Sequence, residues 1–291
     1  NEGPIPASEV TRIVNTATNR YGVYAQDLIS FSEKIKLLAG IRYSYQEAKP
    51  ITTTIATNTV TEETIRNDRA FSPKVGFIYQ PTKNISFFAS YANSFTPNTG
   101  VTIYNETIQP SIIDQYEVGV KKEFWKGVLT TNVTIYQIVN SNLAQTAEFD
   151  ANGNVNTNTN VKSLSGETTS KGIEIDIICK PIDALNIIAG YSYNDMRYTK
   201  TIGTTGSFIE GDRLVRTPAN TANLSFFYTV QTGVLKEVCF GAIGNYIGNR
   251  GGGWNNQVDP SQPNGIWDRE IPVDGYTTID VSLGYNWKQF S

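Results

Sequence analysis

Two carboxylates, Glu174 and Asp176, are spaced so that they would lie side by side on one face of an extended strand. Such a pair can serve general acid–base catalysis only if a nucleophile or a second base reaches the same substrate. No such partner accompanies the pair. The chain also contains no histidine, which excludes a Ser-His or Cys-His nucleophile within it. We therefore predict that the chain is not an enzyme.

Two further segments resemble binding motifs without meeting their requirements. The segment 150–161 begins like a calcium loop, but Val155 stands where the loop needs glycine and Val161 where it needs glutamate. The glycines at 251–253 are not followed by the Lys-Ser/Thr of a phosphate loop. Cys179 and Cys239 are too few for a four-cysteine zinc site. We expect no resident metal or cofactor and two free thiols.

Residues 71–100 show how the elements of the chain are built. Two runs of alternating residues, 71–80 and 85–95, are joined by residues 81–84. A period of two is strand geometry, because successive side chains leave opposite faces of the strand. Pro81 and Asn84 suit a tight turn. This segment therefore predicts a long β-hairpin with one apolar face and one small or polar face.

The same pattern recurs along the chain and predicts about eleven strands, each of roughly 11–15 residues. The predicted strands are 19–31, 34–48, 71–80, 85–95, 112–124, 128–140, 168–180, 185–197, 216–230, 236–248 and 276–288. Short turns alternate with long polar loops, which we place at 49–67, 96–111, 141–167, 198–215 and 249–275, with a further loop at 1–18.

Strand length and loop asymmetry together indicate an all-β, transmembrane antiparallel β-barrel. Strands of soluble proteins are usually about 5–6 residues long, whereas a tilted membrane-spanning strand needs about 9–11. Tight turns at one end and extended loops at the other are typical of outer-membrane barrels. A soluble β-sandwich, whose strands also alternate, is the alternative. The formal net charge of −3 offers no basic face for nucleic acid.

The alternation assigns each strand residue to the lipid or to the barrel interior. We expect the apolar face to contact lipid and the polar face to point inward, with Cys179 outward and Cys239 inward. Residues expected to contact lipid are Phe87, Ala89, Ile175, Ile187 and Leu283, and residues expected to point inward are Ser90, Glu174, Asp176, Ser192 and Ser282. Aromatic residues stand near both ends of the apolar face, as at membrane interfaces. They are Phe31, Tyr79, Phe124, Tyr228 and Tyr285 or Trp287 at one end, and Tyr45, Phe95, Tyr193 and Tyr246 at the other.

Several segments resemble TonB-dependent siderophore receptors. The hairpin SPKVGFIYQPTKNISFFASYANSFTPNTG resembles a barrel hairpin of that family, with a Ser-Pro-basic-Val-Gly opening and a Ser-Phe-x-Pro exit. Further similar segments, in the same order as in the family, are 21–43, 114–124, 170–177 with 217–228, and 276–287. The resemblance implies a 22-stranded barrel occluded by a plug domain. Residues 1–291 would then form a partial barrel domain, with the plug and the closing strands outside this chain.

The resemblance also implies a function and its partners. The expected protein is a receptor in the outer membrane of a Gram-negative bacterium, for TonB-dependent active uptake of a ferric siderophore. TonB would act through the N-terminal plug region, and iron would be present only as part of the transported chelate. The alternatives are a TonB-dependent receptor for another cargo (cobalamin, haem or glycan), a passive porin, or a soluble adhesin-like β-protein.

Aromatic and cationic residues of the long loops are the candidates for cargo contact. Exposed aromatic rings and arginines suit flat, anionic iron chelates, through stacking and charge-assisted hydrogen bonds. The candidate ligand-binding residues are Tyr104, Arg213, Arg250, Trp254 and Trp267, with Phe208 and Arg269 as further candidates in the same loops.

Overall fold

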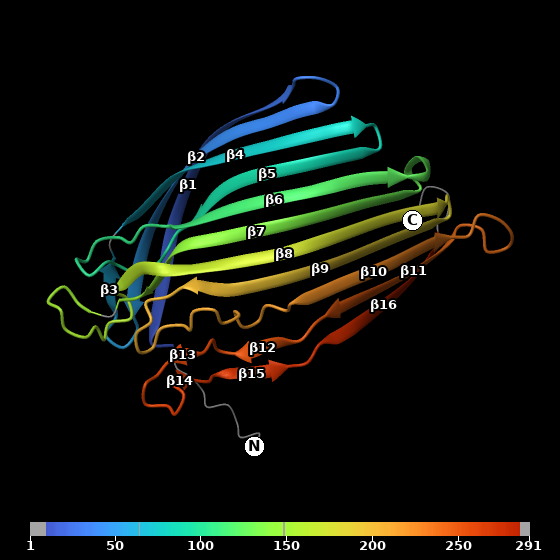
Figure 1. The fold of residues 1–291 in the computed structure, drawn as a ribbon. Coiled ribbons are helices and arrows are strands. Elements are labelled where there is room, and N and C mark those ends of the chain that lie inside the picture. The colour runs from blue at the N-terminus through green and yellow to red at the C-terminus, as the bar shows by residue number, and fades with distance from the viewer. Residues whose placement is uncertain (1–9, 64, 148, 286–291) are drawn as a thin grey trace, which may run out of the picture.

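A computed structural model describes residues 10–63, 65–147 and 149–285, which form one curved antiparallel sheet and a set of loops at one end of it (Figure 1). Eleven strands lie side by side in chain order, and β3 pairs with β2. The strands are β1 (Arg12–Ser30), β2 (Ile35–Thr54), β3 (Thr59–Glu62), β4 (Arg66–Thr82), β5 (Ile85–Thr96), β6 (Ser111–Phe124), β7 (Leu129–Thr146), β8 (Lys162–Ile182), β9 (Leu185–Lys200), β10 (Asn220–Thr229), β11 (Val238–Ile247) and β16 (Tyr276–Tyr285).

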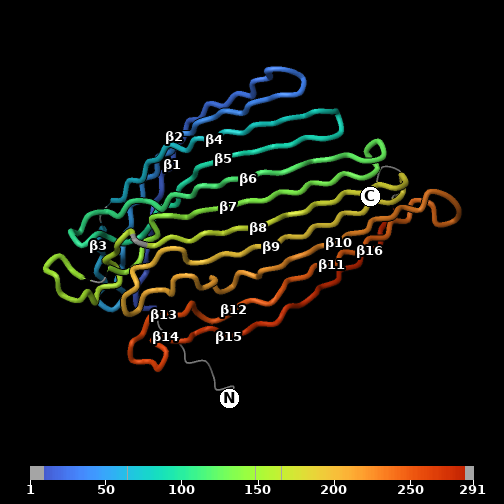
Figure 2. Tube along the Cα trace, in the orientation of Figure 1, coloured from blue at the N-terminus to red at the C-terminus, as the bar shows by residue number. Residues whose placement is uncertain are grey.

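The connections confirm the predicted alternation of short turns and long loops. The trace in Figure 2 shows the turns after β1, β4, β6, β8 and β10 at one end and the long loops at the other. Local sequence explains the short turns. Ser32 Oγ accepts hydrogen bonds from the backbone N–H groups of Lys34 and Ile35. The 3₁₀ turn η1 (Trp125–Gly127) places Gly127 at φ 90°, a conformation that glycine adopts without steric cost.

Several predicted strand limits were wrong, by up to seven residues at the end with the long loops and by about two at the turn end, where β4 ends at Thr82 and β8 at Ile182. β1 begins at Arg12 and β2 continues to Thr54, so segments expected as loops are paired strands. The reason is that the threonines at 52–54 are β-branched and pair with β1 and β3, although their polarity is typical of a loop. β8 likewise begins at Lys162 rather than 168. β10 begins only at Asn220, because Arg216 has a positive φ of 66° and Pro218 has no N–H for the ladder. Trp287 lies outside the described residues.

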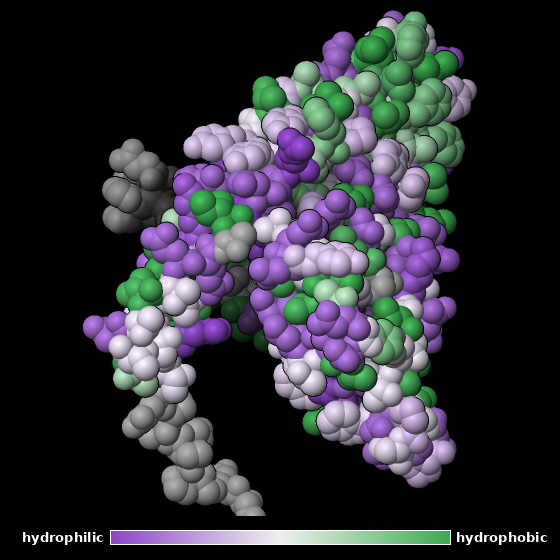
Figure 3. Space-filling view, turned by 90° about the vertical axis from the view of Figure 1, so that its left-hand side faces the viewer, coloured by the Kyte–Doolittle hydropathy of each residue, from purple (hydrophilic) through white to green (hydrophobic). Residues whose placement is uncertain are grey.

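The strand register confirms the predicted division of residues between two faces. Phe77, Ala89, Val118, Ile135, Ile173 and Tyr193 stand opposite one another on successive strands. Ser90, Glu117, Tyr136 and Gly172 form the adjacent row on the other face. Figure 3 looks onto the end with the long loops, where hydrophilic residues dominate, while hydrophobic residues gather at the upper right.

Crowding between strands shows which face is concave. A Cβ added to Gly119 would lie 2.4 Å from the Phe88 ring, and one added to Gly172 would lie 2.5 Å from the Tyr136 ring. Glycines that admit large neighbouring side chains are expected where a sheet curves inward. On the opposite face, Val118 and Ile135 are 53% and 55% exposed. The polar face is therefore the concave, inward one, and the apolar face is the convex, outward one.

The two cysteines follow the same register. Cys179 stands opposite Ile187 on the outward face, whereas Cys239 stands opposite Thr229 and its Sγ lies 3.4 Å from Thr229 Oγ1 on the inward face. Their strands, β8 and β11, are three positions apart in the sheet, and neither cysteine forms a disulfide. The predicted facing and the predicted absence of a disulfide between these two residues are confirmed.

Burial concentrates where the long loops fold rather than in the middle of the sheet. Ala48, Ile108, Ala147 and Tyr198 are at most 5% exposed, and all four lie toward the loop end. A single sheet buries little apolar area against itself, so its outward face requires an apolar solvent. Among the described residues, no helix is long and apolar enough to cross a membrane.

Ile175 lies in the middle of the outward apolar row of β8, so an arginine there is expected to destabilise the membrane-inserted state. We expect Ile175→Arg in the protein to lower the free energy of unfolding in phospholipid vesicles by about 2–4 kcal/mol. Denaturant titration monitored by tryptophan fluorescence measures this loss.

Ser192→Arg on the neighbouring strand is the matched control, because Ser192 belongs to the inward face. We expect it to change the unfolding free energy far less. A large loss for Ser192→Arg with little loss for Ile175→Arg would reverse the assignment of the two faces.

Candidate ligand-binding site

The long loops form two pairs, each held together by backbone hydrogen bonds. The loops 97–110 and 147–161 are joined where Val101 N–H donates to Asn160 O at 3.0 Å and Lys162 N–H donates to Val101 O at 2.8 Å. The loops 201–219 and 248–275 are joined where Gly206 N–H donates to Val258 O at 2.8 Å and Arg216 N–H donates to Gly251 O at 2.6 Å. Hydrogen bonds between loops fix the positions of side chains that lie far apart in sequence.

The loop 248–275 contains regular structure of its own. β12 (Arg250–Gly253) pairs with β15 (Glu270–Val273), and β13 (Gln257–Val258) pairs with β14 (Ile266–Trp267). These short strands bring residues near 250 next to residues near 270. Gly253 has a φ of 68°, and a Cβ there would lie 2.6 Å from Arg269 O. We expected the glycines at 251–253 to belong to an ordinary loop. Their lack of side chains instead permits the close pairing of β12 with β15.

The segment that resembles a calcium loop closes on itself. Asp150 Oδ1 accepts hydrogen bonds from the backbone N–H groups of Asn152 and Asn154, each at 2.9 Å. The N–H groups of this turn stabilise the charged carboxylate and lower the pKa of Asp150. Its carboxylate thus serves the fold of the loop.

Arg213 and Arg250 line one cavity of about 530 Å³, which we call the Arg250 cavity. Asp268, Glu270 and Asp274 also line it, so charges of both signs face the same space. The Arg250 guanidinium lies 5.5 Å from the centre of the Tyr276 ring. Its Nη1 is buried and has no hydrogen-bond partner. An unpaired buried donor carries a desolvation cost that an anionic ligand could remove.

Arg213 differs from Arg250 because two of its guanidinium nitrogens already have partners. Its Nη2 donates to Asn194 O at 2.7 Å, and its Nη1 lies 3.4 Å from Asp195 Oδ1. Asp195 also pairs with Arg197 at 2.9 Å. Arg213 thereby attaches the loop 201–219 to β9, a positioning contact that sequence spacing did not predict.

Trp254 and Trp267 are brought together by a residue between them. The Arg269 guanidinium lies 5.6 Å from the Trp254 ring centre and 4.7 Å from that of Trp267. Its Nη1 donates to Gln257 Oε1 at 2.6 Å. The two indole rings are 64% and 50% exposed. Arg216, whose guanidinium lies 5.8 Å from the Trp254 ring, extends this cation–aromatic cluster.

Tyr104 and Phe208 lie apart from these groups. Tyr104 is 71% exposed on the loop 97–110 and lines neither the Arg250 cavity nor the tryptophan cluster. Phe208 stacks on Tyr198, with ring centres 4.6 Å apart. The structure thus places Arg213 with Arg250 and Trp254 with Trp267. Asp268, Glu270 and Arg216 are neighbours that sequence reasoning missed, because the pairing of β12 with β15 and the hydrogen bond from Arg216 N–H to Gly251 O bring them close.

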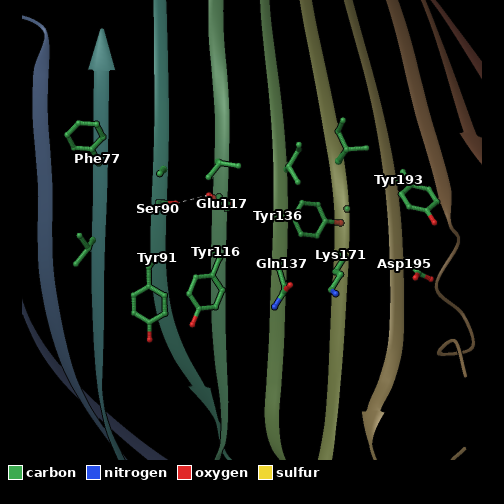
Figure 4. Close-up of a pocket in the computed structure, with 16 residues that line it drawn as sticks. Phe77, Ser90, Tyr91, Tyr116, Glu117, Tyr136, Gln137, Lys171, Tyr193 and Asp195 are labelled. Atoms are coloured by element: carbon green, nitrogen blue, oxygen red, sulfur yellow. Dashed lines mark hydrogen bonds between the residues drawn. The ribbon is translucent and has the colours of Figure 1, made fainter. Parts of the chain in front are cut away.

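A further hollow lies elsewhere, on the outward face of the sheet (Figure 4). It measures about 830 Å³. Tyr91, Tyr116, Gln137, Lys171 and Asp195 stand at one level on five successive strands, β5 to β9. Phe77, Val118 and Ile135 lie in the next outward row. Because this face is the convex apolar one, we do not assign cargo binding to it.

The comparisons with known proteins agree with this architecture. The family model described as TonB dependent receptor-like, beta-barrel, matches residues 2–291. The chain belongs to the TonB-dependent receptor β-barrel family. This receptor barrel is 28% identical over 261 residues to the metal-pseudopaline receptor CntO of Pseudomonas aeruginosa, covering 89% of this chain and 34% of that protein. It is 26% identical over 286 residues to the ferrichrome outer membrane transporter/phage receptor of Escherichia coli, covering 98% of this chain and 33% of that protein.

A solved structure shows the same fold for the receptor barrel. The siderophore receptor PiuA from Acinetobacter baumannii superposes with a TM-score of 0.72 at 22% sequence identity, covering 95% of this chain and 38% of that one. The chain spans about a third of the length of the curated relatives it matches. Membership of this family places the chain in the outer membrane of a Gram-negative bacterium.

Glu270 makes the stability of the Arg250 cavity pH-dependent. Burial raises the pKa of its carboxyl above its ordinary value, and the carboxylates of Asp212 and Asp268 raise the pKa further. A folded-state pKa above the unfolded one means that Glu270 supports the fold at low pH and opposes it once the pH passes the folded pKa. We expect Glu270→Gln to slow hydrogen exchange of the β15 amides at pH 7, and to change it little at pH 4.

The control for this measurement is Glu237→Gln in the turn between β10 and β11, which should leave exchange in β15 unchanged at both pH values. Faster exchange of the β15 amides in Glu270→Gln at pH 7 would contradict the sign of the effect.

Proposed function

We propose that this receptor barrel belongs to a protein that takes up a ferric siderophore across the outer membrane in a TonB-dependent manner. The names of similar proteins support the proposal, since they include receptors for ferrichrome, ferrioxamine B and ferric pyoverdine. The observation that carries it for this chain is the Arg250 cavity at the loop end. There a buried guanidinium nitrogen without a partner lies beside Tyr276 and near other charged side chains.

The loop end can bind a chelate by two kinds of contact. The unpaired donor of Arg250 can form a charge-assisted hydrogen bond with an anionic oxygen of the chelate. The exposed faces of Trp254 and Trp267 can stack on its flat conjugated groups. The short turns at the other end offer only a few residues each. The cargo would therefore bind first at the end with the long loops.

Release toward the periplasm is the second part of the proposal. A stiff antiparallel sheet fixes the loop end relative to the turn end, so binding at the loops need not deform the strands. The inward polar residues, such as Glu174 and Asp176, would then line the path that opens when TonB acts on a plug region. The protein itself would supply no covalent chemistry, and iron would pass through only as part of its chelate.

A receptor for a chelate of another metal is the second candidate. The metal-pseudopaline receptor is 28% identical to this chain, and a chelate of a different transition metal would present similar anionic oxygens to Arg250. Binding assays with matched ferric and non-ferric complexes distinguish the two candidates.

Arg250→Ala tests the proposed binding site. We expect it to weaken binding of the cognate ferric siderophore by roughly tenfold to a hundredfold, because one charge-assisted contact of about 1.5–3 kcal/mol is lost. Equilibrium titration of the full-length receptor against ferrichrome, ferrioxamine B and ferric pyoverdine first identifies the cargo and then measures the loss.

Lys83→Ala is the matched control, because it also removes one cation but lies in the turn between β4 and β5. Trp254→Ala should weaken binding and Lys83→Ala should not. If Arg250→Ala and Trp254→Ala both bind the cargo as tightly as Lys83→Ala, the site is not in this loop.

A further inference from the structure

A second cavity lies where the two loop pairs meet, and it differs in chemistry from the Arg250 cavity. It measures about 530 Å³, and we call it the Gln145 cavity. One wall comes from the end of β7 and the loop 147–161, and the other from residues 202–208 with Gln257. The cavity therefore exists only because two separately built loop pairs lie side by side.

Two side chains of this cavity are buried without hydrogen-bond partners. Gln145 is 9% exposed, and neither its Nε2 nor its Oε1 has a partner. Ser207 is 6% exposed, and its Oγ also has none. Buried polar atoms are normally hydrogen-bonded, so three unpaired atoms around one cavity, two from the end of β7 and one from the loop 201–219, point to a group that binds there.

The protein backbone fixes both side chains in place. Ser207 N–H donates to Thr204 O at 2.9 Å, and Ser207 O accepts from Val258 N–H at 2.9 Å. Gln145 lies on β7 opposite Ser163 of β8. Gly166 makes room for its amide, since a Cβ on Gly166 would lie 2.4 Å from Gln145 Nε2. The unpaired atoms are thus held at defined positions.

The lining defines the chemistry of the ligand. Among the described residues that line the cavity, only Lys162 is charged, and its Nζ already donates to Thr146 Oγ1 at 3.2 Å. The remaining polar groups are neutral amides and hydroxyls, and Phe208 and Ile202 add apolar surface. An amide such as Gln145 both donates and accepts hydrogen bonds. This set complements an uncharged group that also carries donors and acceptors, and it gives an anion no dedicated partner.

We propose that the Gln145 cavity is a second binding site of this receptor barrel, for an uncharged amide- or hydroxyl-bearing group held by Gln145 and Ser207. Two sources share this chemistry: the neutral part of a transported chelate, and a saccharide. Water fills a polar cavity of this size when no ligand is present. A ligand that reproduces the hydrogen bonds of that water can displace it without loss.

The test measures two probes on the full-length receptor by isothermal titration. Ferrichrome represents an uncharged, amide-rich ferric chelate, and N-acetylchitotriose represents a metal-free saccharide. We expect at least one probe to bind. Gln145→Met and Ser207→Ala should each weaken that probe roughly threefold to tenfold, the range for one neutral hydrogen bond. Loss with ferrichrome identifies the chelate as the source, and loss with N-acetylchitotriose identifies a saccharide.

Matched substitutions at the opposite end of the sheet control for general effects. Gln231→Met in the turn between β10 and β11 and Ser32→Ala in the turn between β1 and β2 should leave both affinities unchanged. Val155→Trp is a second approach that leaves the buried atoms intact. Val155 lines the cavity and is 74% exposed, so a large ring there should obstruct the cavity and weaken the same probe.

The thermal midpoint of each variant without ligand distinguishes a binding role from a structural one. Because the buried atoms have no protein partner, Gln145→Met and Ser207→Ala should unfold at the same temperature as the unaltered receptor or slightly above it. A clear fall in the midpoint, binding of neither probe, or unchanged affinity in the Gln145, Ser207 and Val155 variants would each overturn the proposal. If the Gln145 cavity binds no ligand, Arg250→Ala should still weaken binding of the ferric siderophore. The two proposals can therefore fail separately.

Discussion

The structure depends on the requirement that every backbone N–H and C=O group within a membrane be hydrogen-bonded inside the protein. A meander of antiparallel strands meets this requirement, because each strand pairs with its neighbours in chain order from β1 to β16. In a single sheet of this kind, side chains alternate between lipid and interior. This alternation produces the apolar outward rows and the polar inward rows. The hydrogen-bonding requirement also restricts irregular backbone to the two ends of the strands.

The same requirement explains why recognition is left to the loops. Beyond the membrane-spanning rows, the backbone can pair in other ways, and the long loops do so with one another. β12 and β15 pair so that Arg250 stands opposite Val273 and both Arg250 and Glu270 line one cavity, while Val101 links the loops 97–110 and 147–161. Among the buried atoms without partners, Arg250 Nη1 and the Gln145 amide belong to residues that line two cavities left by this pairing. The strands provide a rigid frame, and the loops provide the chemistry.

The sequence predicted the sheet well because its signal is local. Alternation within one strand is enough to assign Ala89 outward and Ser90 inward, and the register agrees. Strand ends were predicted less well, since threonines 52–54 are polar yet pair as strand. For the candidate binding site, the sequence predicted individual residues but not the contacts between them. Contacts such as Arg213 with Asp195, or Arg269 between two tryptophans, join positions far apart in the chain, and no local pattern encodes them.

The central claim is that cargo binds at the end with the long loops, on the residues that the loop pairs bring together. The most direct measurement is a crystal structure of the full-length receptor with its ferric chelate, in which anomalous scattering locates the iron. The account predicts an iron peak at the loop end, with an oxygen of the chelate hydrogen-bonded to Arg250. An iron peak at the turn end, or a chelate bound on the outward face, would contradict it.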